Sequence, residues 1–129
     1  MRPLVISLVG ALLVHFAACE TVDNTIDYRD YSFIDTILAA DTIANDELVA
    51  VVHVYPAGCN HLQRIESREY ADTLEVRALY HFYATEAPCA HGSGLDTTDY
   101  ALHFSSSGRH FLAYRRNDTT RVLQPVFVE

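Results

Sequence analysis

Short runs in which hydrophobic and polar residues alternate dominate the second half of the chain. In residues 73–83 (TLEVRALYHFY), every second position from Leu74 to Phe82 is apolar, and most positions between them carry Thr, Glu, Arg or His. Residues 99–105 alternate in the same way, with Tyr100, Leu102 and Phe104 in phase. Because side chains of a strand point to opposite faces in turn, this period of two predicts strands with one buried face.

Other strands are expected where apolar runs end at turn sequences. The run LVAVVHVY is rich in β-branched residues and stops at Pro56-Ala57-Gly58, and turns are indicated at Gly108 and at Asn117-Asp118. These further strands cover residues 33–38, 48–55, 62–67, 110–116 and 121–128. A total of about seven short strands, with turn signals every ~8–12 residues, predicts an all-β sandwich or barrel.

Residues 35–47 (DTILAADTIANDE) allow two interpretations. Ile37, Leu38 and Ile43 would share one face of a helix. The alternative is a short strand followed by an Ala-Asn-Asp-Glu turn into the next strand, and this is the interpretation we favour.

Composition narrows the class of protein further. The chain has 129 residues, enough for one domain, and 50% of them are hydrophobic, which argues against disorder. It carries 9 Lys+Arg against 17 Asp+Glu, a formal net charge of −8. Because nucleic acids and anionic membranes are bound by clustered positive charge, a general nucleic-acid binder is excluded.

The N-terminus has the plan of a secretory signal peptide. Arg2 is followed by an apolar run and then by the small residues Ala17 and Ala18. The apolar stretch over residues 4–18 is shorter than the ~17–25 residues that usually span a bilayer. Residues 1–18 are therefore expected to be removed and to form no part of the folded domain.

The end of this segment, Phe16-Ala17-Ala18-Cys19, resembles the lipobox of bacterial lipoproteins. The resemblance implies cleavage before Cys19, lipidation of Cys19 and anchoring of the mature chain to a membrane. Glu20, in place of Asp, favours the outer membrane by the same analogy. The expected organisation is a signal peptide over residues 1–18, a lipidated Cys with an acidic tether over 19–32, and a β-sandwich domain over 33–129.

Two cysteines remain once Cys19 carries lipid. In an exported domain, the even pair Cys59 and Cys89 is expected to form a disulfide. The bridge would close a loop of 31 residues, from Cys59 to Cys89. On the chain-entropy model, a disulfide that closes such a loop stabilises the fold by roughly 3–4 kcal/mol.

The layout of the domain resembles the small immunoglobulin-like domain of many bacterial lipoproteins. Matching pieces are residues 48–55, Gly58-Cys59-Asn60-His61-Leu62, residues 74–83, Pro88-Cys89, residues 100–104, 108–114 and 122–128. The resemblance implies an immunoglobulin-like antiparallel β-sandwich of about seven strands with one disulfide. Such domains often have Tyr two residues after the turn glycine, where this chain has His110, so His110 is expected to pack inward beside Leu112 and Tyr114.

A repeated Cys-x-His pattern, Cys59-Asn60-His61 and Cys89-Ala90-His91, is the most specific candidate for chemistry. With the cysteines bridged, His61 and His91 would lie near the bridge and suit Zn²⁺ or Cu²⁺. With the cysteines reduced, the four side chains would form a Cys₂His₂ set. The alternative is a structural disulfide flanked by two exposed histidines.

A second pair of histidines, His81 and His103, falls on the outward faces of two predicted strands. If those strands pair, the two imidazoles would be cross-strand neighbours able to share a metal ion. Otherwise they are solvated surface residues.

Other site signatures are missing from the sequence. It contains no Gly-x-Ser-x-Gly nucleophile elbow, and Glu66 and Glu69 flank Arg64 and Arg68 in what is expected to be a solvated charged turn. We therefore expect a lipid-anchored, non-catalytic binding or accessory module of the cell envelope, without cofactor, whose partner is a protein or glycan. The alternative expectation is an envelope metal-binding protein that uses His61 and His91.

Overall fold

A computed structural model describes residues 28–83 and 92–129. Over these residues the chain is all-β, as the alternation predicts, and no helix is present that could cross a membrane. Nine strands are found there, compared with the expected seven: β1 (Tyr28–Ser32), β2 (Ile34–Leu38), β3 (Thr42–Ile43), β4 (Glu47–Tyr55), β5 (Asn60–Tyr70), β6 (Thr73–Phe82), β7 (Gly94–Leu102), β8 (Gly108–Arg115) and β9 (Arg121–Val128).

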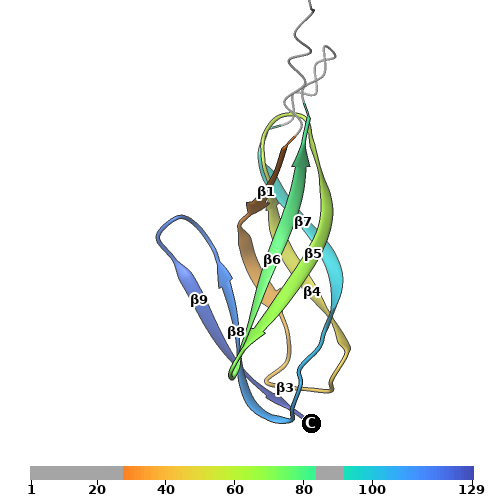
Figure 1. Ribbon diagram of the computed structural model, residues 1–129. Coiled ribbons are helices and arrows are strands. Elements are labelled where there is room, and N and C mark those ends of the chain that lie inside the picture. The colour runs from red at the N-terminus through yellow and green to blue at the C-terminus, as the bar shows by residue number, and fades with distance from the viewer. Residues whose placement is uncertain (1–27, 84–91) are drawn as a thin grey trace, which may run out of the picture.

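The strands form two sheets in a sandwich-like arrangement (Figure 1). The larger sheet has the order β1-β6-β8-β9-β3, with β5 on the other edge of β6, and the smaller sheet has the order β2-β4-β7. Most neighbours are antiparallel, but β6 runs parallel to β8 and β3 runs parallel to β9. A sandwich-like all-β fold is thus confirmed.

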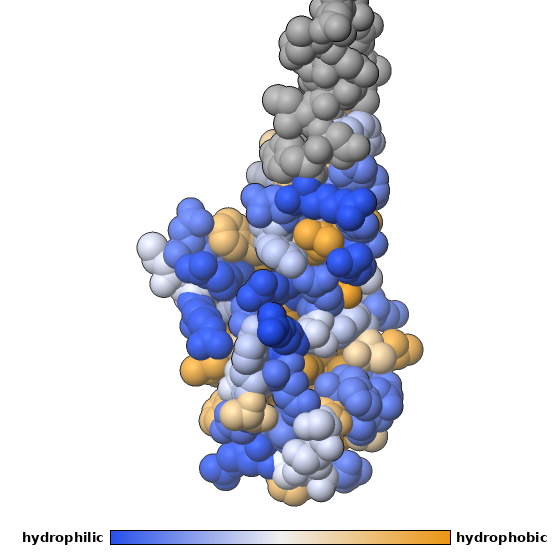
Figure 2. Space-filling view, in the orientation of Figure 1, coloured by the Kyte–Doolittle hydropathy of each residue, from blue (hydrophilic) through white to orange (hydrophobic). Residues whose placement is uncertain are grey.

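The alternating apolar residues of the sequence lie on the inner faces of the strands, and the polar residues between them lie mainly on the outer faces. Leu74, Val76, Ala78 and Tyr80 of β6 are all buried, as are the residues in phase with them on other strands. Their side chains fill the space between the sheets together with Phe104, which follows the end of β7. The outer face visible in Figure 2 is mainly hydrophilic, with hydrophobic residues scattered over it. The hydrophobic effect therefore sets which face of each strand points inward.

Strand structure begins before residue 33, the expected start of the domain. Residues 28–32, assigned from the sequence to the acidic tether, form β1 and pair with β6 from Phe82 back to Ala78. The chain then crosses to the smaller sheet at Phe33, whose carbonyl accepts a hydrogen bond of 2.9 Å from the Val54 amide. Because Arg29, Asp30 and Tyr31 are exposed, this strand lacks the apolar alternation by which strands are recognised.

Two other strands differ in extent from the prediction. β5 runs over eleven residues, so Glu66 and Glu69 lie on a strand and not on a charged turn. Its polar composition follows from its place at an edge of the larger sheet, paired only with β6. β7 begins at Gly94, five residues before the expected start, and ends at Leu102.

Residues 35–47, for which the sequence allowed either a helix or a strand followed by a turn, have an extended backbone. It contains β2, β3 and a turn at Asn45-Asp46, where Asp46 has a φ of 63°. The Ala44 amide donates to Glu47 Oε2 at 2.7 Å, which closes that turn. The strand-and-turn interpretation is confirmed.

His110 packs inward, as expected. It is 3% exposed and lies against Phe104, with ring centroids 4.8 Å apart. Its Nε2 is 2.9 Å from the Ser106 carbonyl oxygen, so the imidazole donates to the turn that precedes β8. The histidine thereby both fills the core and stabilises the turn.

Candidate functional site

The larger sheet contains a fork along one edge of β6. On this edge β6 pairs with β8 through Glu75, opposite Ala113, and with β1 from Ala78 onward, opposite Ser32. Between these contacts the β8–β9 hairpin diverges from β1 (Figure 1). The divergence follows from the short parallel contact of β6 with β8, which involves only three register pairs.

A cleft of about 750 Å³ opens at this fork. Its walls come from β1 and the crossing at Phe33, from β6 at Val76 and Arg77, and from the β8–β9 hairpin at Arg115 and Asp118. The volume is within the range of ligand pockets in proteins, about 300–1,000 Å³. The cleft is therefore a candidate binding site.

A polar network joins Tyr31, Glu75 and Arg77 in one wall of the cleft to Glu66 on β5. The Arg77 guanidinium donates to Glu75 Oε1 at 2.8 and 3.0 Å, and it lies over the Tyr31 ring, 5.1 Å from its centroid. The Tyr31 hydroxyl donates to Glu66 Oε1 at 2.6 Å. These contacts lower the pKa of Glu66, raise that of Tyr31 through the bond to Glu66, and raise that of Arg77 through the bond to Glu75. The wall therefore presents a protonated phenol between a carboxylate and a guanidinium.

Each wall of the cleft also contains a local polar contact. The Tyr31 amide donates to the Asp30 carboxylate at 2.8 Å, which is a local bond within β1. On the opposite wall, Arg115 Nη2 donates to the Asp118 carbonyl at 2.9 Å within the hairpin turn. Both contacts are made inside one wall, and neither joins the two walls.

His61, a metal ligand expected from the sequence, lies on the outer face of β5. It is exposed, and its nearest aromatic neighbour is His81, with ring centroids 5.0 Å apart. Its expected partner His91 lies outside the described residues, so the His61–His91 pair stays a prediction. The structure instead brings His61 beside His81, a neighbour that the sequence did not predict.

The predictions for Cys59, Cys89 and Cys19 also involve residues that the structure does not describe. Cys59 precedes β5, and its carbonyl accepts the Tyr83 amide at 3.1 Å. Cys89 and the lipidation residue Cys19 lie outside the described residues. The Cys59–Cys89 disulfide and the lipid on Cys19 therefore stay predictions.

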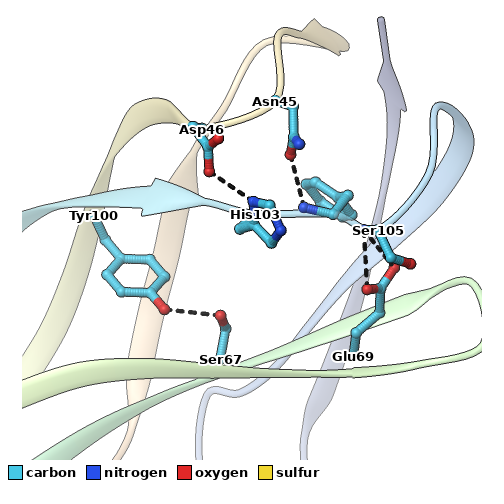
Figure 3. A network of polar contacts seen from close by, with 8 residues as sticks. Asn45, Asp46, Ser67, Glu69, Tyr100, His103 and Ser105 are labelled. Carbon is cyan, nitrogen blue, oxygen red and sulfur yellow. Dashed lines mark hydrogen bonds and ion pairs between the residues drawn. The ribbon is translucent and has the colours of Figure 1, made fainter.

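His81 and His103 are not cross-strand neighbours, so the condition for a shared metal ion at these two residues is not met. β6 belongs to the larger sheet, while His103 follows β7 in the smaller one, so the two strands are not neighbours. His103 Nδ1 instead lies 2.8 Å from Asp46 Oδ1, a pair that is exposed to solvent (Figure 3). Within the described part of the chain, no serine or cysteine hydrogen bond to His103 accompanies this Asp–His pair.

The contacts around His103 connect the end of β7 to its neighbours. Asn45 Oδ1 accepts the Phe104 amide at 2.7 Å, and Glu69 Oε2 accepts the Ser105 amide at 3.1 Å (Figure 3). Further along β7, the Tyr100 and Ser67 hydroxyls are 2.8 Å apart. Because Ser67 and Glu69 belong to β5, this network fixes the smaller sheet against an edge of the larger one.

A buried histidine, His53, escaped the sequence analysis. It is 0% exposed, its Nδ1 is 2.7 Å from the Tyr80 hydroxyl, and its Nε2 is 2.9 Å from Thr98 Oγ1. Desolvation lowers its pKa, partly opposed by the charge of Asp96. The signal was present in the sequence, since His53 follows Val49 and Val51 in period two and must share their buried face.

Comparison with known proteins gives no relative for this chain. No family model and no curated protein matches the sequence, and no solved structure matches the fold.

Proposed function

We propose that the mature chain is a lipid-anchored, non-catalytic binding or accessory module of the bacterial cell envelope, held in the outer membrane through Cys19. The lipobox-like Phe16-Ala17-Ala18-Cys19 supports the anchor. The cleft at the fork between β1 and β8 is the observation that carries the binding role.

The proposal includes an immunoglobulin-like form of the sandwich. The β2-β4-β7 sheet, the β8–β9 hairpin and the parallel contact of β3 with β9 support this comparison. One feature departs from the usual layout of such domains: β6, the second strand of the β5–β6 hairpin, lies beside β8 and runs parallel to it. This departure is what opens the fork.

The partner we propose is a protein that supplies an extended segment. Strand edges take up extended chains through main-chain hydrogen bonds, and side-chain pockets give the selectivity. The walls of the cleft offer the edge of β1, the aromatic residues Tyr31 and Phe33, and charges of both signs at Arg77 and Glu75. Aromatic and arginine side chains are enriched where protein interfaces are strongest.

Photo-crosslinking in intact cells tests the role of the cleft. A photoreactive phenylalanine replaces Tyr31 in the cleft or, as control, Tyr70 at the far end of β5. The two tyrosines are 46% and 47% exposed, and each has an arginine over its ring, so they are closely matched. We expect one discrete protein adduct from position 31 and none from position 70.

A blocking variant makes the test specific. Ser93 lies in the wall of the cleft and is exposed, so Ser93→Trp fills the opening without touching the core. It should reduce the adduct at position 31 several-fold. Equal adducts at both positions, or an adduct that contains carbohydrate and no protein, would contradict the proposed partner.

The lipid anchor has its own test. Intact mass of the chain purified from its native envelope should show acylated Cys19 and loss of residues 1–18. Cys19→Ala should leave an uncleaved, unlipidated precursor, while Cys59→Ala should still carry the lipid. Normal maturation of Cys19→Ala would refute the anchor.

A further inference from the structure

His61 of β5 and His81 of β6 are direct partners in an antiparallel ladder. Side chains at such positions have Cβ atoms about 4.5–5.5 Å apart and point to the same face of the sheet. That face is the outer one, because the next residue of β6 in the other phase, Tyr80, is 2% exposed and packs in the core. The backbone thus holds two imidazoles side by side at the surface.

The spacing of the two rings fits a shared metal ion. With metal–nitrogen bonds of about 2.1 Å and an angle of about 90–110° at the metal, which covers tetragonal Cu²⁺ and tetrahedral Zn²⁺, the centroids of two bound imidazoles lie about 5 Å apart. The centroids of His61 and His81 are 5.0 Å apart, with an interplanar angle of 69°. Rotation of the side chains about their own bonds is therefore enough to direct one nitrogen of each ring at a common point.

The surroundings of the pair favour an open, accessible site. Tyr83 completes a cluster of three rings, 5.8 Å from His61 and 6.1 Å from His81. Arg29 of β1 pairs with His81 on the side away from His61, so it flanks the pair without separating the rings. Across the described residues, no group of three or more His, Cys, Asp or Glu side chains is placed to hold a metal.

The geometry points to a surface site at His61 and His81 for one divalent transition-metal ion, with Cu²⁺ the strongest binder. Neutral imidazole suits Cu²⁺ and Zn²⁺, and affinity along the first-row series peaks at Cu²⁺. The site lies on the outer face of β5 and β6, and its residues are not those of the cleft. It is independent of the proposed binding of a protein segment.

Copper titration of the metal-free full chain in detergent tests this inference. Cu²⁺ binding is followed by calorimetry, and the ligands are identified by electron paramagnetic resonance. We expect one ion per chain, with hyperfine coupling to two nitrogens. His61→Ala and His81→Ala should each remove one nitrogen coupling and lower the affinity by more than about tenfold, since even outer-shell partners of a metal are worth that much.

Two further histidine variants serve as controls. His103→Ala removes an exposed histidine of the other sheet, and His91→Ala removes the partner expected from the sequence; both should bind Cu²⁺ like the parent. Affinity unchanged in His61→Ala or His81→Ala, or lost in His91→Ala or His103→Ala, would overturn the site. Amide signals broadened by Cu²⁺ at residues 60–62 and 80–83 of the unaltered chain check the same location without substitution.

Discussion

Removal of the Tyr80 hydroxyl should destabilise the domain through His53. Both side chains lie between the sheets, 2% and 0% exposed, with the hydroxyl 2.7 Å from His53 Nδ1. Burial raises the pKa of Tyr80 to about 12, so the phenol stays protonated and is able to donate to the imidazole. Tyr80→Phe keeps the ring and leaves one buried nitrogen without a partner, which costs about 1–3 kcal/mol.

Urea unfolding at pH 7.5 measures this loss. For a domain of this size the slope is about 1–3 kcal/mol per molar urea, so the midpoint should fall by about 1 M with the slope unchanged. Tyr100→Phe is the matched control, because its hydroxyl also has one partner, Ser67 at 2.8 Å, but is only part-buried. Water can replace that bond, and the control should lose about 1 kcal/mol or less.

A double variant separates the hydrogen bond from packing. His53→Leu with Tyr80→Phe replaces both polar partners by apolar groups, so it should be less destabilised than the sum of the two single variants. A Tyr80→Phe protein as stable as the parent, or losses that simply add, would refute the argument that the bond matters because its acceptor is buried.

Other substitutions test the remaining parts of the fold. Burial lowers the pKa of His53 from 6.5, so the stability that its neutral form confers is complete above pH 6.5 and is lost as pH falls through the lowered value. When the pH is lowered from 7.5 to 5.5, the free energy of unfolding should therefore fall more for the parent than for His53→Leu. Gly108 has a φ of 109° with open space around it, so Gly108→Ala should cost about 1–3 kcal/mol from backbone strain alone, while Gly92→Ala should be neutral in thermal unfolding. Phe104→Ala should cost about 3–5 kcal/mol in urea unfolding, because Phe104 is 2% exposed, whereas Phe127→Ala, at a site 51% exposed, should cost far less.

Local patterns predicted the strands well where one face is buried and the other is solvated. The alternation from Leu74 to Tyr80 identified β6 and its inner face, and the resemblance to immunoglobulin-like domains implied the inward position of His110. β1 was missed because a short edge strand with exposed charges has no such alternation. The extra length of β5 was missed for a related reason, since its edge position leaves it polar.

The candidate sites depended on pairings that no local pattern contains. The sequence singled out His61 with His91 as a candidate metal pair, and it left open whether His81 and His103 are neighbours. Register decides the actual neighbour: the hairpin of β5 and β6 sets His61 opposite His81, while His103 lies in the other sheet. Residues far apart in sequence meet through backbone hydrogen bonds, and a shift of one residue would send each side chain to the opposite face.

By itself, the sequence determined the all-β class, the inner faces of most strands, and the lipobox-like segment on which the proposed location rests. Each of these depends on residues adjacent in the chain, with a period of two or a fixed spacing. Only the tertiary structure decided that one edge of β6 pairs first with β8 and then with β1, and the cleft opens between these two strands. It also decided that His61 and His81 lie side by side. Those features come from the packing of whole strands between two sheets, where burial of the common core selects one pairing among many.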